Sequence, residues 1–178
     1  MTARRPARVV VTTAASDGPA WPRANRIADA FRSHGFTAVV VDHRGDDPAA
    51  VATQIAATAD AGIRAGDDIV VVGEGDAAAA ALAAVAERPG VVRGAVALGG
   101  HPERVAAMLP AIHVPTLLIV AGSDSTERRI DRELVYSLAG PRRVLAVPGA
   151  RTGFVETDTL DQASRLAATW LHDHVPPR

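Results

Sequence analysis

The 178-residue chain has no cysteine and no lysine, and only 3% of its residues are aromatic. The lack of cysteine excludes disulfides, thiolate metal ligands and cysteine nucleophiles together. No apolar run approaches the ~20 residues of a membrane-spanning helix. The N-terminal residues 1–6 lead into an apolar run that is too short for a secretory signal peptide. We therefore expect a cytoplasmic protein without a membrane partner.

The charges are nearly balanced, with a formal net charge of -1 at pH 7. A nucleic-acid partner usually needs a clustered basic face. The run that comes nearest to one is Arg4, Arg5 and Arg8, close to the N-terminus. Because phosphate affinity needs several aligned charges, we interpret this run as part of a solvated tail and expect no nucleic-acid partner.

Short apolar, β-branched runs alternate with longer amphipathic segments along the whole chain. Such runs are typical of parallel strands that are covered on both faces. We expect strands at 9–13, 38–41, 69–72, 92–98, 116–120 and 143–147, and helices at 22–34, 48–64, 76–88, 126–139 and 157–174. This alternation predicts an α/β fold of three layers, with a doubly wound, mainly parallel sheet of about six strands. We expect one domain over residues 1–178, with residues 1–7 mobile.

The carboxyl ends of parallel strands are where sites form in doubly wound sheets. The loops at that edge are expected at residues 13–21, 42–47, 73–77, 99–103, 122–126 and 149–154. Candidate functional residues are therefore sought in these six loops.

The segment Gly73-Glu74-Gly75-Asp76-Ala77 joins an expected strand to a helix through small residues. This is the layout of a nucleophile elbow, in which one small residue lies two positions before the nucleophile and another lies two positions after it. The central residue is Gly75, which has no side chain with which to attack. The segment also matches a G-x-G-x-x-A dinucleotide pattern, but Glu74 and Asp76 would repel a pyrophosphate there. Asp76 also suits a helix N-cap.

Several segments together carry a family resemblance: Pro22-Arg23-Ala24-Asn25-Arg26, Asp42-His43-Arg44-Gly45-Asp46, Ala86-Glu87-Arg88-Pro89, Ala97-Leu98-Gly99-Gly100, residues 114–124 and residues 147–154. On these segments the chain resembles the small α/β-hydrolases related to dienelactone hydrolase, of the kind without a cap domain. The most specific match is Pro115 to Asp124, which resembles the P-T-L-x-I-x-G-x-x-D strand that delivers the acid of the catalytic triad.

The resemblance implies a role for three positions. The nucleophile position is Gly75, the acid position is Asp124, and the histidine position falls on Thr152. The H-G motif of the oxyanion loop is absent, and Thr12-Thr13-Ala14-Ala15 stands in its place. Because a triad needs a nucleophile and a base, the resemblance implies a degenerate triad without the usual hydrolysis.

Other groups at the same edge remain candidates for chemistry. His101 follows Gly99-Gly100 at a strand end, and a His101–Asp124 pair is the strongest catalytic candidate among them; His43 also lies at this edge. Thr13, Glu74 and Asp76 are expected to line a pocket, and the two acids could do acid-base work if their pKa values differ. The histidine spacing does not indicate a metal site, so we expect neither a metal nor a cofactor.

Three hypotheses stay open. The first is a pseudo-hydrolase, a non-hydrolytic protein that binds a small ligand or a protein partner. The second is a lyase, isomerase or cyclase that uses acid-base groups at the old active site, in a pocket that a homodimer would close. The third is a chain that worked beside, or was split from, a larger protein, since some relatives of this fold are joined to phosphoribosyltransferase-like domains.

Overall fold

The computed structural model describes residues 7–13, 20–41, 48–156 and 158–175. Its strands form one six-stranded sheet in the order β2-β1-β3-β4-β5-β6, and every pairing is parallel. The strands are β1 (Arg8–Thr13), β2 (Thr37–Val41), β3 (Ile69–Glu74), β4 (Val92–Leu98), β5 (Thr116–Ala121) and β6 (Arg142–Val147). The predicted sheet is confirmed, with each strand within two residues of its expected bounds.

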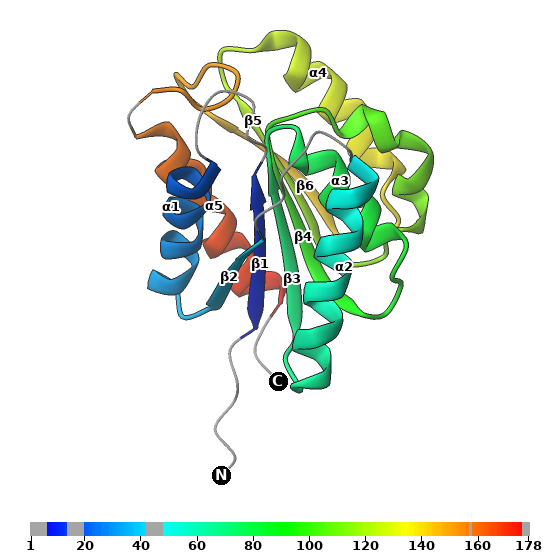
Figure 1. Ribbon diagram of the computed structural model, residues 1–178. Coiled ribbons are helices and arrows are strands. Elements are labelled where there is room, and N and C mark those ends of the chain that lie inside the picture. The colour runs from blue at the N-terminus through cyan, green and yellow to red at the C-terminus, as the bar shows by residue number, and fades with distance from the viewer. Residues whose placement is uncertain (1–6, 14–19, 42–47, 157, 176–178) are drawn as a thin grey trace.

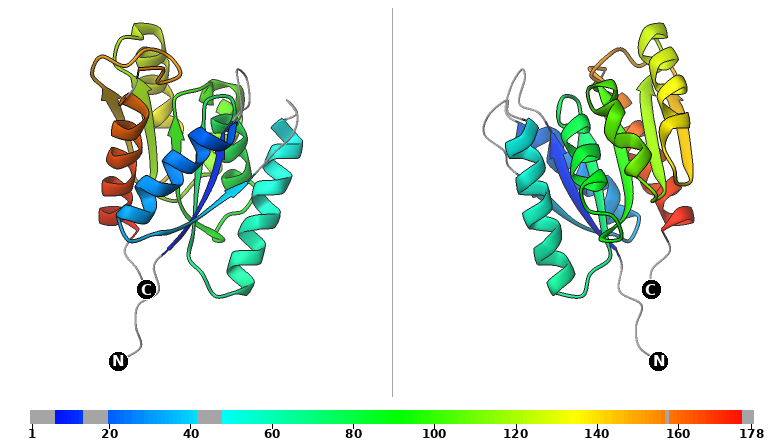
Figure 2. Two further views of the ribbon diagram at one scale, coloured as in Figure 1. Left: turned by 60° about the vertical axis from the view of Figure 1, so that its left-hand side comes forward. Right: turned by 90° about the vertical axis from the view of Figure 1, so that its right-hand side faces the viewer.

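The helices cover both faces of the sheet. They are α1 (Ala20–Ser33), α2 (Pro48–Arg64), α3 (Ala77–Ala86), α4 (Ser125–Leu134) and α5 (Thr159–His174), with 3-10 turns η1 (Pro102–Ala111) and η2 (Val135–Ser137). Helices α1 and α5 pack together on one face, and α2, α3, η1 and α4 cover the other (Figure 1). Figure 2 shows the same layers from two further sides. The predicted three-layer α/β architecture is confirmed.

Each face of the sheet has its own apolar core. Ile27 and Phe31 of α1 pack with Leu171 of α5 on one face, and all three side chains are fully buried. Ile55 of α2 and Leu82 of α3 occupy the other core. Successive strand residues point to opposite faces, so the continuous apolar strands supply both cores. None of the described helices is long and apolar enough to cross a membrane.

Two stretches between β4 and β6 differ from the expected elements. The connection from β4 to β5 holds η1, which was not predicted; Pro110 lies inside it and Val105 leaves helical geometry. The helix expected at 126–139 ends at Leu134 and continues as η2. Leu138 then takes an extended conformation and is 2% exposed in the core.

The carboxyl ends of β3 and β4 lie in close contact beneath the start of α3. Nine of the ten residues of α3 are buried, and all of these except Leu82 are alanine or valine. A Cβ atom on Gly73 would lie 2.6 Å from the Cβ of Ala81. A Cβ atom on Gly100 would overlap the carbonyl oxygen of Gly75. The small side chains therefore let the helix and both turns approach closely, and this positions the turn at Gly75.

We expect Gly100→Ala to destabilise the fold much more than Gly90→Ala. Both glycines have a similar positive φ, 85° and 82°, so both substitutions bear the cost of that backbone conformation, about 1–2 kcal/mol. Only Gly100 has backbone atoms in the way, whereas a Cβ on Gly90 meets no described atom within 4 Å. Overlap with backbone should add about 1–3 kcal/mol. Urea unfolding of the two variants measures the difference, and equal losses would contradict the crowding at Gly100.

Candidate functional site

The turn after β3 joins the strand to α3 through Gly75. Gly75 has a φ of 61°, its N–H donates to the carbonyl of Leu98 at 3.1 Å, and its carbonyl accepts from Ala78 at 2.9 Å. A Cβ atom built on Gly75 would have no described heavy atom within 4 Å. The turn therefore holds open space where a side chain would project, and glycine leaves that space without a reactive group.

Asp124 lies at the carboxyl end of β5 and caps α4. Its Oδ1 accepts hydrogen bonds from the backbone N–H groups of Thr126 at 3.0 Å and Glu127 at 2.8 Å, and Thr152 Oγ1 donates to its Oδ2 at 2.7 Å. These bonds, the one from Glu127 above all, lower the pKa of Asp124. The carboxylate is therefore ionised and held in place. Thr152 makes the contact with the acid, and its hydroxyl is not a base at neutral pH.

His101 and Asp124 each bond to other groups. His101 Nδ1 lies 2.9 Å from Glu103 Oε1, and its side chain is 51% exposed. Both carboxylate oxygens of Asp124 have the partners named above. The expected His101–Asp124 pair is thus not formed in the structure, because His101 starts η1 and turns toward Glu103 on that element. His43 lies outside the described residues.

Glu74 and Asp76 flank Gly75 and point into different surroundings. Glu74 is buried, and Arg23 donates a hydrogen bond of 2.6 Å to its Oε1. Burial raises the pKa of Glu74, and the bond from Arg23 opposes that rise. Asp76 is half exposed and lies 3.4 Å from Arg104; it stands at the N-cap position of α3, yet its side chain makes no capping bond in the described chain. Thr13, opposite Glu74 in the β1–β3 register, is buried.

Arg23 is a site residue that the sequence did not single out. The nitrogen that bonds Glu74 also donates to the carbonyl of Gly153 at 2.7 Å. The side chain thus ties α1 to the end of β3 and to the loop after β6. Its partners are 51 and 130 residues away in sequence, so no local pattern could have indicated this bridge.

Two further carboxyl groups on α4 were also missed. Glu127 is half buried, its Oε2 has no hydrogen-bond partner in the described structure, and burial raises its pKa to about 7. Its Oε1 would lie 3.3 Å from a Cβ on Gly99, next to the elbow. One turn later, Asp131 is 2% exposed, and burial together with the nearby Glu127 raises its pKa to about 7. Neither residue was assigned a role from the sequence, because their burial depends on how α4 packs against the rest of the fold.

A shallow hollow of about 490 Å³ opens beside Asp124, lined by Ser123, Asp124, Ser125, Arg151, Thr152 and Val155. Arg151 is bound to Glu156 through its Nε at 2.6 Å and its backbone N–H at 3.0 Å. These bonds lower the pKa of Glu156 to about 2. Val155 is 60% exposed. The hollow therefore combines one fixed carboxylate, hydroxyls and an apolar side chain. Within the described residues, no three acid or histidine side chains are grouped so as to hold a metal ion.

No known family model matches the chain. Two proteins of Mycobacterium tuberculosis, from strains CDC 1551 and H37Rv, are each 36% identical to it over 103 residues. Both are named for a proposed phosphoribosyl transferase activity. The match covers 58% of this chain but only 23% of each relative, so the chain spans less than a quarter of their length.

Solved structures of α/β-hydrolases resemble the chain over nearly its whole length. Dienelactone hydrolase from Anabaena variabilis superposes with a TM-score of 0.87 at 24% identity, covering 97% of this chain and 88% of that one. The esterase domain of a Rhodothermus marinus protein gives 0.78 at 14% identity, covering 98% and 90%. A monoacylglycerol lipase of Paleococcus ferrophilus gives 0.78 at 14%, covering 94% of each chain. At these identities the likeness establishes the fold alone. The predicted α/β-hydrolase-like fold is confirmed, and the described connection from β4 to β5 holds η1 rather than a cap domain.

We expect the protein to lose stability as the pH rises from about 4 to about 7, in part because of Asp131. The unfolded chain releases this proton near pH 3.8, whereas the folded chain holds it until about pH 7. In that window the folded state binds more protons than the unfolded state, so the free energy of unfolding falls with rising pH and levels off above it. Asp131→Asn removes the effect, and it should be more stable than the unchanged protein at pH 8 by on the order of 2 kcal/mol.

Urea unfolding at pH 5 and pH 8 measures this effect. Asp173→Asn, at an exposed position of α5, is the matched control and should keep the pH slope of the unchanged protein. If both variants have the same slope, the buried carboxyl of Asp131 does not cause it.

Proposed function

We propose that this α/β-hydrolase-fold protein is a pseudo-hydrolase, which binds a small ligand or a protein partner at its strand ends and does not hydrolyse it. The observation that carries the proposal is the turn at Gly75, where open space meets a residue without a side chain. The contact between Thr152 and Asp124 supports it independently, since a hydroxyl occupies the place where the acid would orient a base.

The missing groups remove the chemistry of the usual mechanism. A triad needs a base near neutral pKa to take the proton of the nucleophile. When nucleophile and base are both absent, binding and backbone donors alone leave a rate several orders of magnitude lower. Asp124 has no base to orient; it caps α4 and fixes the loop that contains Thr152. In this proposal, the acid is retained because it holds the strand-end hollow in shape.

The strand-end hollow supports a small ligand as the first kind of partner. Its volume of about 490 Å³ lies within the ~300–1,000 Å³ usual for small-molecule sites. Asp124 carries a negative charge there, and Val155 supplies an exposed apolar surface. A ligand with a hydrogen-bond donor and a short apolar part would suit both. A protein partner is the second kind, since the hollow is open on the surface.

Restoring the two lost groups tests the proposal. We expect the unchanged protein to resist labelling by a fluorophosphonate and to give no burst of product with esters, thioesters or lactones. The double variant Gly75→Ser with Thr152→His should react slowly with the fluorophosphonate, because Asp124 and the open space are already in place. Mass spectrometry of the intact protein measures the adduct.

The matched control is Gly90→Ser with Thr152→His, which adds a serine at another open glycine of positive φ, before the amino end of β4 and so at the opposite edge of the sheet. It should not be labelled. Labelling or a burst with the unchanged protein would overturn the pseudo-hydrolase. A folded but unreactive double variant would contradict the assignment of Gly75 and Thr152 to the triad positions.

Glu127 favours an enzyme of altered chemistry as the second candidate. A carboxyl group with a pKa of about 7 and a free oxygen is suited to acid-base work at neutral pH. It lies next to Gly99, close to the elbow. A lyase, isomerase or cyclase could use this group without a covalent intermediate. A second copy of the chain would then have to form a closed pocket around this group, because the strand-end hollow is open and is not lined by Glu127.

Proton exchange separates the two candidates. Small lactones and keto acids with exchangeable α-protons would be incubated in D₂O and followed by NMR. An acid-base enzyme should catalyse exchange with a midpoint near pH 7, and Glu127→Gln should abolish it. Glu133→Gln on the exposed side of the same helix should leave it unchanged. If the unchanged protein catalyses no exchange, the pseudo-hydrolase remains the better account.

The relatives from Mycobacterium tuberculosis bear on the third hypothesis. Because 103 residues of this chain match 23% of a longer protein, we propose that the chain corresponds to one part of such a polypeptide. The transferase name describes the whole relative, so we assign no phosphoribosyl transfer to this chain.

A further inference from the structure

A basic groove runs along α4 toward β6, starting at Ser125, which also lines the strand-end hollow. One hollow of about 370 Å³ is lined by Ser125, Arg128, Arg129, Arg132, Glu133 and Tyr136. A second, of about 520 Å³, is lined by Arg132, Val135, Tyr136, Arg142, Arg143 and Val144. The two share Arg132 and Tyr136, and we name them together the α4–β6 groove. Each is large enough for a small organic ligand.

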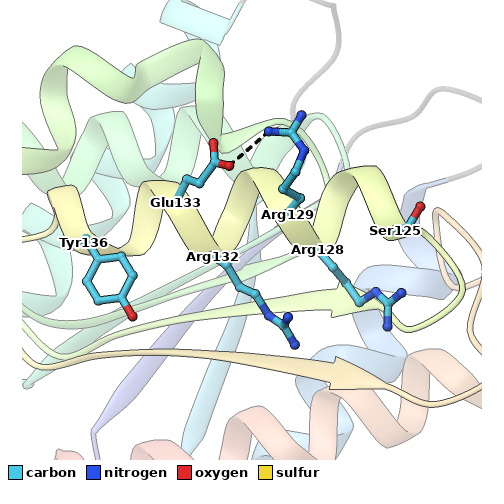
Figure 3. Close-up of a pocket in the computed structure, with 6 residues that line it drawn as sticks. All are labelled: Ser125, Arg128, Arg129, Arg132, Glu133 and Tyr136. Carbon is cyan, nitrogen blue, oxygen red and sulfur yellow. Dashed lines mark hydrogen bonds and ion pairs between the residues drawn. The ribbon is translucent and has the colours of Figure 1, made fainter.

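Helix α4 and the turn η2 that follows it present three of these side chains as one stripe. Arg128, Arg132 and Tyr136 are spaced four residues apart and lie on one face. Figure 3 shows all three on the side that faces β6, while Arg129 and Glu133 pair with each other on the other flank of the same hollow. The negative charge of Glu133, the acidic residue of the groove, is therefore already paired with Arg129.

Several positive charges in the groove remain without a carboxylate partner. In the described structure, Arg132 and Arg143 make no hydrogen bond or ion pair. Arg128 donates a 3.3 Å bond to the backbone carbonyl of Asp124, and its charge also helps to lower the pKa of that residue. Guanidinium groups bind the oxygens of phosphates, as of carboxylates, in a bidentate manner. The free guanidinium groups of α4 and β6 therefore suit a ligand that carries phosphate.

Tyr136 adds a flat aromatic surface beside these charges. Its side chain is 77% exposed, which is unusual for so large a ring in this protein. The Cζ atom of Arg142 lies 5.9 Å from the ring centroid, and Arg142 is itself anchored to the carbonyl of Leu138 at 3.1 Å. The ring is therefore held by a fixed cation, and a planar group of a ligand can stack on it.

We propose that the α4–β6 groove binds a nucleoside phosphate, with the phosphates on Arg128, Arg132 and Arg143 and the base stacked on Tyr136. The site goes beyond the proposed function and does not depend on Gly75 or Thr152. A nucleic acid is a less suitable ligand, because the whole chain has a net charge of -1 and the free guanidinium groups are few. The sequence alone does not indicate this cluster, since its arginines come from a helix and a strand that meet only in the fold.

Isothermal titration calorimetry at low salt tests the site with ADP, adenosine and inorganic pyrophosphate as probes. ADP should bind with a Kd below about 1 mM, and each of the other two about tenfold more weakly or worse, because each lacks one half of the contacts. Added salt should weaken ADP binding.

Substitutions at exposed positions locate the site without threatening the fold. Arg132→Gln should weaken ADP binding about tenfold through a lost charge-assisted contact. Tyr136→Ala should weaken it by about as much, and Tyr136→Phe should retain it, because stacking requires only the ring. Arg64→Gln, at the exposed end of α2, is the control and should bind ADP as the unchanged protein does.

Four results would overturn the proposal. The first is the absence of heat on titration with ADP at about 1 mM, and the second is an equal loss of ADP binding for Arg64→Gln and Arg132→Gln. The third is pyrophosphate binding as tight as ADP binding. The fourth is single-stranded DNA binding that is tighter than ADP binding and insensitive to Tyr136→Ala. The last would indicate a surface for nucleic-acid phosphates instead. Failure of the labelling experiment at Gly75 would leave this site untouched, since the two regions share none of the substituted residues.

Discussion

The arrangement of the strand ends depends on a close approach of backbone segments. The turns after β3 and β4 touch where Gly100 faces the carbonyl of Gly75, and the alanines of α3 pack directly over Gly73. Any larger side chain at these points would separate the helix from the sheet. The tight turn at Gly75, with its positive φ, persists because these contacts hold it, and the space that it opens persists with it.

The carboxyl groups around this turn show how strongly surroundings decide the state of one functional group. Asp124 accepts hydrogen bonds from the start of α4 and from Thr152, so its pKa is lowered. Glu74 is buried with a guanidinium partner, and its pKa is raised despite that partner. Glu127 has a pKa of about 7, because burial raises it more than a backbone hydrogen bond and the nearby His101 lower it. An environment that separates pKa values in this way is typical of functional sites.

Helix α4 contributes to both surfaces that we propose to bind ligands. Its N-terminus fixes Asp124 and thus the strand-end hollow, and the stripe through Arg128, Arg132 and Tyr136 forms the α4–β6 groove. Asp131, on the buried side of the same helix, is 2% exposed and has an unpartnered oxygen in the described chain. A helix that bears an unfavourable buried carboxyl and a row of unpaired cations is not optimised for stability alone. This supports binding rather than packing as the role of its outer face.

The sequence by itself determined the architecture and placed a glycine at the centre of the turn after β3. Periodicity is a local property, so the apolar runs were sufficient to predict a parallel sheet of about six strands in three layers. The tertiary structure alone decided which side chains meet. Arg23 bonds to Glu74 and Gly153 across 51 and 130 residues, His101 turns to Glu103 rather than Asp124, and Arg132 joins Arg143 in one groove. Contacts of this kind depend on how distant elements pack, and neither spacing nor composition encodes them directly.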